Sequence, residues 1–403
     1  MRRAVSSEKR ANEMLKSVRQ FIRQSNRLGE NFWTGASDVG LFLSVKPPSY
    51  AEIARRFLAG AGSQEIRSDV GNRIDACADA LRGTRYLRRW SPAIAIQTTR
   101  TATQLRMVQR ASPDRVRVIL SNLPVDVAEF NAAASGRPRL TLDRLKRLDQ
   151  ALRSAQKASL AARRKQYASI VLFPELSVPR RWMRNLARHA VERNLSIVAG
   201  IEYKKTSNGL VNQAMGVFPD PWENAAIVLW TKRHPAHEEE KALRDLPVPQ
   251  HFLSDDEQMR RLIVESAHCR MSVLICSELF EAAPLSEVSG HVELLLVPCW
   301  NRDTPSFDHL AHATASLLVH AFVCVANNAE ASDSRIVAPI KEPRREREWC
   351  RLIHREENQI VWGDLPVAEL RRVHEGIEPV DSGLPPEVRR EYRPLPPGWK
   401  PSR

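Results

Sequence analysis

The chain has 403 residues, a formal net charge of +14 and a hydrophobic content of 43%, so it can bury a substantial core without a disulfide scaffold. Its six cysteines include no CxxC pair, and most lie in apolar runs, as reduced buried thiols commonly do. No stretch approaches the roughly 18 apolar residues of a membrane helix, and the N-terminus lacks the apolar core of a signal peptide. We therefore expect a soluble, cytoplasmic protein with no membrane partner.

The positive charge is concentrated in the first part of the chain. Residues 1–170 hold 32 Lys and Arg against 14 Asp and Glu, whereas residues 171–403 hold 29 against 33. Such an uneven distribution is typical of a protein whose basic half binds nucleic acid or another polyanion. A solvated, Arg-rich helical surface accounts for the same numbers.

In chain order, residues 1–110 are predicted to form a mostly helical, basic extension. Met14, Leu15, Val18 and Phe21 recur at helical spacing, and the successive prolines of the KPPSY segment interrupt that pattern. The Pro-rich residues 377–403 are predicted to form an extended tail.

Residues 111–376 are predicted to form an α/β domain, because short apolar runs alternate with amphipathic helical patterns. A loop is expected over 131–138, and a long basic helix is expected to begin at Leu142. The candidate strands are Val116–Leu120, Ser169–Phe173, Ser196–Tyr203, Ala225–Leu229, Met271–Ile275, Val292–Val297, Phe322–Ala326, Arg335–Ala338 and Gln359–Trp362.

Three of these runs end in a reactive side chain. Glu175 follows the strand in SIVLFPELSVP, Lys232 follows the strand in AAIVLWTKRHP, and Cys276 ends the strand in MSVLICSELF. Strand ends in α/β folds are where ligand crevices form. Taken singly, each residue has an ordinary structural explanation: a buried thiol, a carboxylate at a helix start, or a solvated lysine.

Together the three side chains form a coherent catalytic set. A carboxylate can take the proton of a neighbouring thiol, and an ammonium stabilises the thiolate that results. The thiolate can then attack a carbonyl or nitrile carbon. Lys232 and the backbone N–H of Ser277 would hold the oxyanion, and Glu175 would pass its proton to the leaving nitrogen.

The chain resembles the nitrilase superfamily of carbon–nitrogen hydrolases. The matching segments are FPE at 173–175, K-x-H-P at 232–235 and I-C-x-E at 275–278, and further similarity extends over about residues 115–375. The resemblance implies a four-layer α/β/β/α sandwich and a Glu175–Lys232–Cys276 triad. It also implies hydrolysis of a small amide or nitrile without a cofactor or metal, in a homo-oligomer.

The same resemblance implies a second, positioning glutamate shortly after the lysine. Glu240 has the family's commonest spacing, and Glu238 and Glu239 are alternatives. Trp300 and Asn301, just past a strand end, are predicted to line the substrate site. The chain departs from the family at Ser277, where an aromatic residue is usual, which leaves the substrate class open.

Three other functions stay open. The basic half, followed by a nitrilase-like domain, resembles bacterial antiphage proteins in which such a domain follows a reverse transcriptase, although no polymerase Asp-Asp motif is present. A catalytically silent scaffold is a further alternative. The pairs His309/His312 and His234/His237 have spacings that zinc ligands sometimes show, but neither has a third ligand at a convincing spacing.

Overall fold

The computed structural model describes residues 94–98, 102–107, 113–219, 225–253, 261–266, 269–353, 359–377 and 391–396, the first two ranges as backbone only. The chain divides into two compact units, Met1–Tyr86 and Leu87–Arg403, and every described residue belongs to the second. The predicted helices of residues 1–93 and most of the predicted tail, 377–403, lie outside the described residues.

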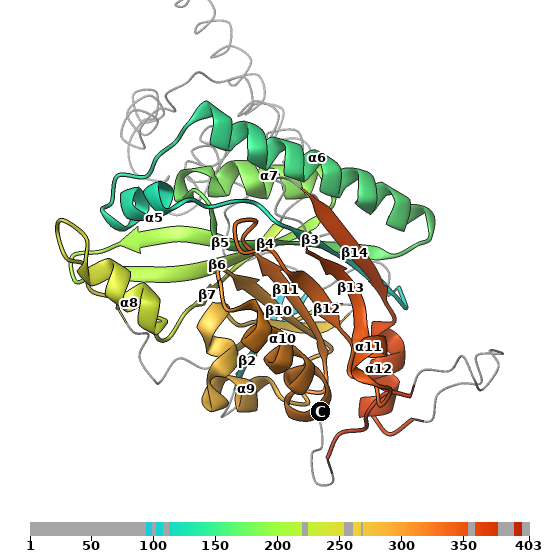
Figure 1. The fold of residues 1–403 in the computed structure, drawn as a ribbon. Coiled ribbons are helices and arrows are strands. Elements are labelled where there is room, and N and C mark those ends of the chain that lie inside the picture. The colour runs from blue at the N-terminus through green and yellow to red at the C-terminus, as the bar shows by residue number, and fades with distance from the viewer. Residues whose placement is uncertain are drawn as a thin grey trace, which may run out of the picture. The chain divides into compact units, whose positions relative to one another are not determined.

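Two sheets form the centre of the described part of the chain (Figure 1). The first has six strands in the order β14-β3-β4-β5-β6-β7. Its members are β3 (Val116–Ser121), β4 (Ala168–Val178), β5 (Ser196–Lys205), β6 (Leu210–Pro219), β7 (Ala225–Thr231) and β14 (Ile360–Leu365). β3, β4 and β5 run parallel, and the pairs β5–β6, β6–β7 and β14–β3 are antiparallel.

The second sheet has eight strands in the order β1-β2-β8-β9-β10-β11-β12-β13. Its members are β1 (Ile94–Thr98), β2 (Ala102–Met107), β8 (Arg261–Glu265), β9 (Arg270–Val273), β10 (Leu294–Cys299), β11 (Phe322–Asn327), β12 (Ser334–Val337) and β13 (Glu348–Leu352). β9, β10 and β11 run parallel.

Helices cover the outer faces of the two sheets, which pack against each other through β4, β10 and β11 (Figure 1). α6 (Leu142–Arg164) and α7 (Met183–Arg193) lie on the six-stranded sheet, and α9 (Ala282–Val288) and α10 (Thr304–Ala313) lie on the other. The remaining helical segments are α5 (Val127–Ala134), η3 (Arg180–Trp182), α8 (His237–Arg244), η4 (Cys276–Phe280), η5 (Thr314–Leu318), α11 (Arg344–Arg347) and α12 (Val367–His374). The predicted α/β sandwich with helix, sheet, sheet and helix layers is confirmed.

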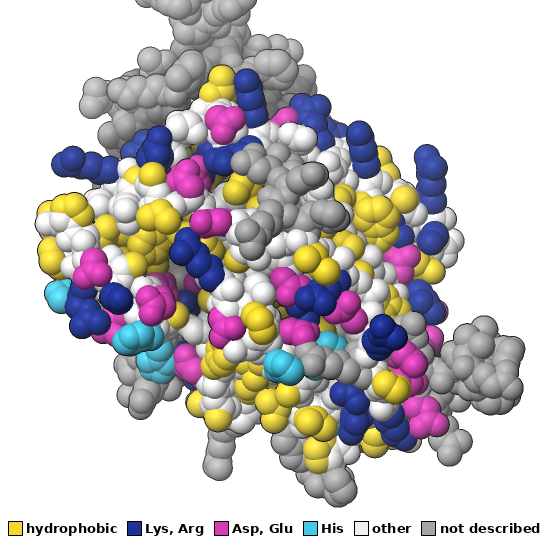
Figure 2. All heavy atoms as spheres, in the orientation of Figure 1, with side chains coloured by type: hydrophobic (Ala, Val, Ile, Leu, Met, Phe, Trp, Pro, Cys, Tyr) yellow, Lys and Arg dark blue, Asp and Glu magenta, His cyan; other side chains and the backbone are white. Residues whose placement is uncertain are grey.

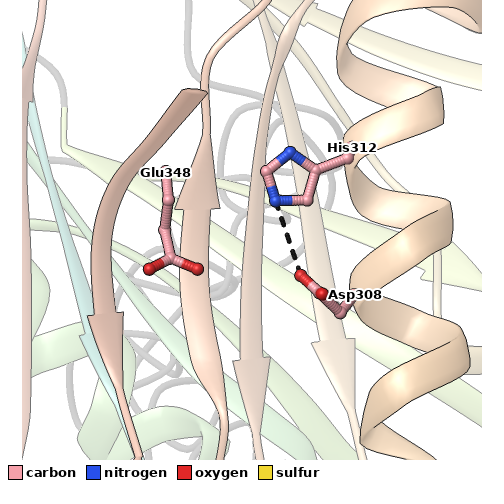
Figure 3. Close-up of side chains that lie close together, drawn as sticks. All are labelled: Asp308, His312 and Glu348. Carbon is pink, nitrogen blue, oxygen red and sulfur yellow. Dashed lines mark ion pairs between the residues drawn. The ribbon is translucent and has the colours of Figure 1, made fainter. Parts of the chain in front are cut away.

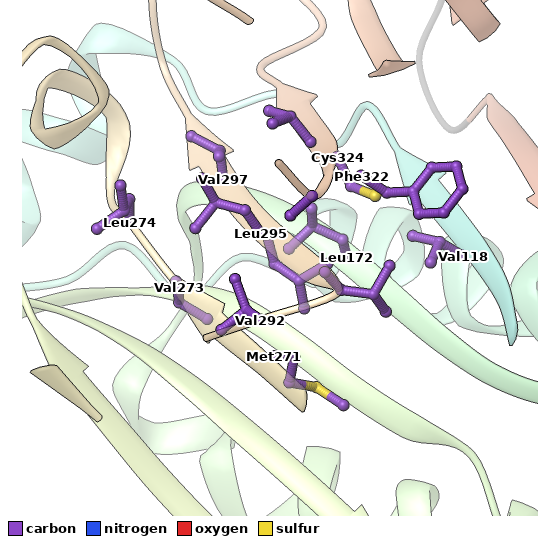
Figure 4. Close-up of a cluster of buried hydrophobic side chains, with 14 of the residues drawn as sticks. Val118, Leu172, Met271, Val273, Leu274, Val292, Leu295, Val297, Phe322 and Cys324 are labelled. Carbon is purple, nitrogen blue, oxygen red and sulfur yellow. The ribbon is translucent and has the colours of Figure 1, made fainter. Parts of the chain in front are cut away.

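The core lies between the sheets because their central strands are apolar on both faces (Figure 4). Val118 and Leu172 come from the first sheet, and Leu295 and Val297 come from the second; all four are fully buried. Burying one such side chain contributes about 1.5–3 kcal/mol. This interface fixes the strand ends that carry the reactive residues.

The observed elements differ from the sequence prediction in several places, and the short strands β8 and β13 were not predicted. The strand β6 was not predicted, because Asn212, Gln213 and Gly216 interrupt its apolar run. β1 and β2 lie in the region predicted to be mostly helical, and β2 pairs with β8 of the α/β unit, so strand structure starts earlier than expected. Residues 127–134, partly in the predicted loop, form α5, whereas the predicted long helix from Leu142 is confirmed as α6.

None of the described helices combines the length and the apolar character that crossing a bilayer requires.

Gly200 on β5 allows the chain of β4 to bend where Glu175 leaves the regular ladder. The register between β4 and β5 shifts after Phe173. A Cβ atom at Gly200 would lie 2.4 Å from Cα of Glu175 and 2.5 Å from the carbonyl oxygen of Pro174. Only glycine therefore fits beside this bend.

We expect Gly200→Ala to lower the free energy of unfolding by about 3 kcal/mol, because the added methyl group meets backbone atoms that cannot rotate away. Urea denaturation measures the change. Gly376→Ala is the control: no atom lies within 4 Å of its Cβ, and only its left-handed φ of 71° carries a cost, about 1 kcal/mol. Equal losses in the two variants would contradict the packing role of Gly200.

Candidate active site

Glu175 is held at the bend of β4 by three hydrogen bonds. Its Oε1 accepts from Nδ2 of Asn212 at 2.8 Å and from Nζ of Lys232 at 3.0 Å, and its Oε2 accepts from the backbone N–H of Trp300 at 3.2 Å. The next residue, Leu176, adopts a left-handed φ of 56°. The carboxylate is therefore fixed in a buried position by partners from three different strand ends.

Lys232 lies directly after β7, with 1% of its surface exposed. Its backbone N–H donates to the carbonyl of Asn212 at 2.9 Å, and its Nζ donates to Oε2 of Glu239 at 2.6 Å as well as to Glu175. A buried ammonium requires such partners, because desolvation alone would cost several kcal/mol. The single ammonium group of Lys232 thus forms ion pairs with the carboxylates of both Glu175 and Glu239.

Cys276 opens the short helix η4 after β9 and has a left-handed φ of 50°, rare for a residue with a side chain. The buried carboxylate of Glu278 holds this turn. It accepts from the backbone N–H of Ile275 at 2.8 Å and from that of Arg233 at 3.2 Å, and it pairs with Arg261 at 3.0 Å. The same carboxylate therefore ties the cysteine turn to the segment that carries Lys232.

The structure brings Glu175, Lys232 and Cys276 into one buried cluster. The Cys276 sulfur interacts electrostatically with Lys232 and with the hydroxyl of Tyr203, and it hydrogen-bonds the thiol of Cys299. Cys276 itself is 5% exposed. The arrangement can supply a nucleophile, a base and a fixed positive charge at one place.

The ionisation of the two carboxylates is driven in opposite directions. Burial, reinforced by the charge of Glu239, raises the pKa of Glu175 in spite of Lys232. Burial acts in the same direction on Glu239, but Lys232 and the hydroxyl of Tyr203 outweigh it and lower the pKa of Glu239. Burial opposes the charge of Lys232, yet the two carboxylates raise its pKa well above the ordinary value. Glu175 is therefore the group suited to carry a proton, while Glu239 stays ionised.

The glutamate beside the lysine is Glu239, and the prediction of Glu240 is corrected. Glu239 accepts from Lys232, from the hydroxyl of Tyr203 at 2.5 Å and from the backbone N–H of Ala236 at 3.1 Å. Glu240, like Glu238, is exposed on α8. Since α8 starts at His237, the third residue of its first turn faces inward, and spacing along the sequence alone does not reveal which one that is.

The other predicted site residues have different surroundings. Ser277 follows the cysteine, and its hydroxyl is buried without a hydrogen-bond partner among the described residues. Trp300 donates its backbone N–H to Glu175 and packs its ring edge-on against Phe130, with 5.5 Å between centroids. The backbone N–H and carbonyl of Asn301 form hydrogen bonds with the side-chain amide of Asn327. The side chain of Asn301 accepts from the N–H of Asp303. Asn301 is thus held in a turn.

Asn212, Tyr203 and Cys299 belong to the cluster although the sequence did not single them out. Asn212 donates to Glu175 and, at 3.1 Å, to Oε1 of Glu239. Asn212 lies on β6, a strand that the sequence analysis did not predict. Phe130 lies on α5, between β3 and β4, and packs on both Tyr203 and Trp300, so α5 lines the wall of the cluster.

A second group of ionisable side chains comes from α10, which carries Asp308 and His312, and from β13, which carries Glu348 (Figure 3). Asp308, His312 and Glu348 offer ligand atoms within 4.8 Å of one another. However, the buried guanidinium of Arg335 pairs with Asp308 and lies 3.8 Å from Glu348. The positive charge that a metal would bring is already present, so we interpret this group as an ion-pair centre. His312 contacts Asp308 at 3.4 Å, and His234 contacts Glu281 at 3.0 Å.

No protein-family model and no curated protein matches the sequence. Solved structures match the fold. An amidase from Nesterenkonia sp. is 16% identical over 66% of this chain and 94% of its own, with a TM-score of 0.41. A CN-hydrolase superfamily protein from Xanthomonas campestris, with an arsenic adduct in its active site, is 13% identical over 64% of this chain and 93% of its own, with a TM-score of 0.44.

A cysteine-to-serine variant of the Nesterenkonia AN1 amidase, described as a nitrilase-superfamily enzyme, gives 16% identity and a TM-score of 0.43 over 64% of this chain and 93% of its own. These structural neighbours are nitrilase-superfamily proteins.

We expect Glu239→Gln to shift the pH dependence of Cys276 alkylation by iodoacetamide towards lower pH. Glu175 must be ionised to take the thiol proton, and the charge of Glu239 helps to keep its pKa raised. Removing that charge lowers the pKa of Glu175, so its ionisation, and the rise in alkylation rate, begins at lower pH.

Glu240→Gln is the matched control, since the side chain is exposed on the same helix. Its alkylation profile should coincide with that of the wild type. A shift in Glu240→Gln and none in Glu239→Gln would show that the sequence-based assignment was right.

Proposed function

We propose that the protein hydrolyses a carbon–nitrogen bond of a small amide or nitrile, with Glu175, Lys232 and Cys276 as its catalytic triad. The observation that supports this most directly is the shared ammonium: Lys232 Nζ is 3.0 Å from Glu175 and 2.6 Å from Glu239, in the cluster that contains the Cys276 thiol. A structural thiol needs neither a neighbouring base nor a buried cation. A nucleophilic thiol is activated by a neighbouring base and by a positive charge that stabilises the thiolate.

In this proposal Glu175 takes the proton of Cys276 as the sulfur attacks the carbonyl or nitrile carbon. The raised pKa of Glu175 suits this role, because a carboxyl that binds a proton more readily is a better base and can return that proton to the leaving nitrogen. With an amide, the C–N bond breaks, ammonia or an amine departs, and the acyl group stays on sulfur. With a nitrile, the attack gives a thioimidate, and one water must add to its carbon before ammonia departs and the same thioester is left. Glu175 then takes a proton from water, which attacks the thioester and restores the thiol.

Lys232 supplies the fixed positive charge of the site. Its two carboxylate partners keep it protonated, so it can stabilise the thiolate and then the developing oxyanion without changing its own charge. The backbone N–H of Ser277 is the second donor that we assign to the oxyanion, since the first N–H groups of a helix have no partner within it. Glu239 and Asn212 act as positioning residues through Lys232 and Glu175.

We expect the wild-type protein to gain an acyl mass during exposure to its substrate, and Cys276→Ala to gain none. Intact-mass analysis across a panel of amides and nitriles measures this directly, and peptide mapping assigns the adduct. Turnover should fall by at least about 10³-fold in Cys276→Ala, because no other group can form the thioester.

Cys324→Ala is the matched control, because Cys324 is equally buried but lies on β11, away from Glu175 and Lys232. It should retain acylation. An acyl group mapped to any residue other than Cys276, or full turnover by a folded Cys276→Ala protein, would refute the proposed nucleophile.

As a second candidate function, we propose that helix α6 binds nucleic acid. Four exposed basic residues, Lys146, Arg153, Lys157 and Arg164, are spaced seven, four and seven residues apart. At about 3.6 residues per turn they share one line about 27 Å long, opposite the buried face of the helix. We call this line the α6 basic stripe; Figure 2 shows Lys and Arg side chains along this edge of the molecule. A row of this kind suits a phosphate backbone.

We expect the full chain to bind single-stranded RNA or duplex DNA with an affinity that falls steeply with salt. The double variant Lys157→Glu/Arg164→Glu should reduce the slope of log K against log salt by about 2, because each phosphate contact contributes about 1. Fluorescence anisotropy with labelled oligonucleotides measures both quantities. The control Lys241→Glu/Arg244→Glu changes the same charges on exposed positions of α8. Absence of binding at low salt, or equal effects of both double variants, would remove α6 as the binding element.

A further inference from the structure

The proposed mechanism leaves one buried thiol of the cluster without a role. Cys299 is the last residue of β10 and is fully buried, and the next residue, Trp300, donates its N–H to Glu175. A small apolar residue would fill the same volume. The presence of a thiol at position 299 therefore has to be explained by the residues that surround it.

The strand register places Cys299 beside the nucleophile. β10 runs parallel to β9, with Leu294 opposite Met271, Leu295 opposite Ser272 and Leu296 opposite Val273. This pairing ends at Val273, and the N–H of Leu274 still donates to the carbonyl of Leu296 at 3.1 Å, so Cys276, two residues further along, and Cys299, at the end of β10, lie at the same edge of the sheet. Figure 4 shows β9 and β10 with their labelled side chains next to each other. The helix η4, which begins at Cys276, contacts β10, which ends at Cys299.

The two side chains are also in contact. The thiol of Cys299 is hydrogen-bonded to that of Cys276. Among the five described cysteines, the other three have different surroundings: Cys269 bonds Ser266, Cys350 lies on β13, and Cys324 lies on β11. Cys299 is thus the described thiol within reach of the nucleophile.

We propose that Cys299 is the resolving thiol of a reversible disulfide with Cys276, formed when a hydroperoxide oxidises the nucleophile. Formation of the bond depends only on the geometry of the two thiols, whereas its consequence, reversible loss of hydrolysis, rests on the proposed function. The pair protects the nucleophile from irreversible oxidation.

The chemistry balances in two steps. The Cys276 thiolate attacks a peroxide oxygen; an S–O bond forms, the O–O bond breaks, and water or an alcohol leaves while sulfur is oxidised to the sulfenic acid. Cys299 sulfur then attacks Cys276 sulfur; the S–S bond forms, the S–O bond breaks, and hydroxide leaves as water with the Cys299 proton. A thiol reductant returns two electrons and restores both thiols.

The surroundings of the two sulfurs agree with these roles, in which Cys276 is oxidised first and Cys299 then attacks it. Burial, together with the hydrogen bond to Cys276, raises the pKa of Cys299 well above its ordinary value, so it remains a thiol until its partner is oxidised. Cys276 is the more exposed of the two, at 5% against 0%, so a peroxide reaches it first. Glu175, which interacts electrostatically with Cys299, is the base that can take its proton.

The experiment treats the full-length protein with hydrogen peroxide and maps peptides without reduction. We expect the Cys276 and Cys299 peptides to become linked, with the loss of two hydrogen masses, and dithiothreitol to restore the free thiols. In Cys299→Ser the link should be absent, and Cys276 should instead gain one oxygen mass, which dithiothreitol removes, and then a second, after which dithiothreitol no longer restores the thiol. Cys299→Ala, checked by circular dichroism, repeats the test if the serine variant is unfolded.

Cys269→Ser is the matched control, since Cys269 is buried with a pKa raised to about 12 by burial and does not touch Cys276. It should link as the wild type does. Wild-type protein in which Cys276 passes to the sulfinic acid without linkage, or links to another cysteine, would overturn the proposal. None of these readouts needs a substrate, so a linked but catalytically silent protein would separate this proposal from the proposed function.

Discussion

The buried ammonium of Lys232 is the interaction on which the site depends. It joins Glu175 from β4 to Glu239 from α8, and its own backbone is bonded to Asn212 of β6. Two carboxylates around one cation leave an excess negative charge in a region that water does not reach. The cluster resolves this excess by favouring a proton on Glu175, the carboxyl whose pKa is raised. The raised pKa of Glu175 is thus a consequence of its burial and of the presence of two carboxylates beside one ammonium group.

The fold class and three reactive positions could be predicted because each depends on local patterns. The apolar runs that precede Glu175, Lys232 and Cys276 encode the strands β4, β7 and β9, although β4 continues through Glu175 to Val178. The neighbouring glutamate could not be predicted in the same way. Whether Glu239 or Glu240 faces inward depends on the residue at which α8 begins and on how that helix packs, and three consecutive glutamates carry no signal about either.

The residues that the sequence analysis missed share a physical cause. Asn212 and Tyr203 point towards the site from alternate positions of strands in which polar residues interrupt the apolar run, so a search for apolar runs passes over them. Cys299 is hidden for the opposite reason, because it lies inside an apolar strand where a thiol is an ordinary core residue. Both kinds of contact arise only when the strands are placed side by side.

The departure at Ser277 can be understood from the way the cysteine turn is held. The turn needs a left-handed residue at Cys276, a conformation that costs about 1–2 kcal/mol and must be stabilised by its surroundings. Glu278 provides this through the N–H groups of Ile275 and Arg233 and through Arg261, so none of the restraint comes from the side chain that follows the cysteine. An aromatic residue can therefore be replaced by serine without loss of the turn. What changes is the space and the polarity beside the sulfur, where the serine hydroxyl is buried and unpartnered among the described residues. The same backbone can thus hold the Cys276 thiol beside side chains of different size and polarity.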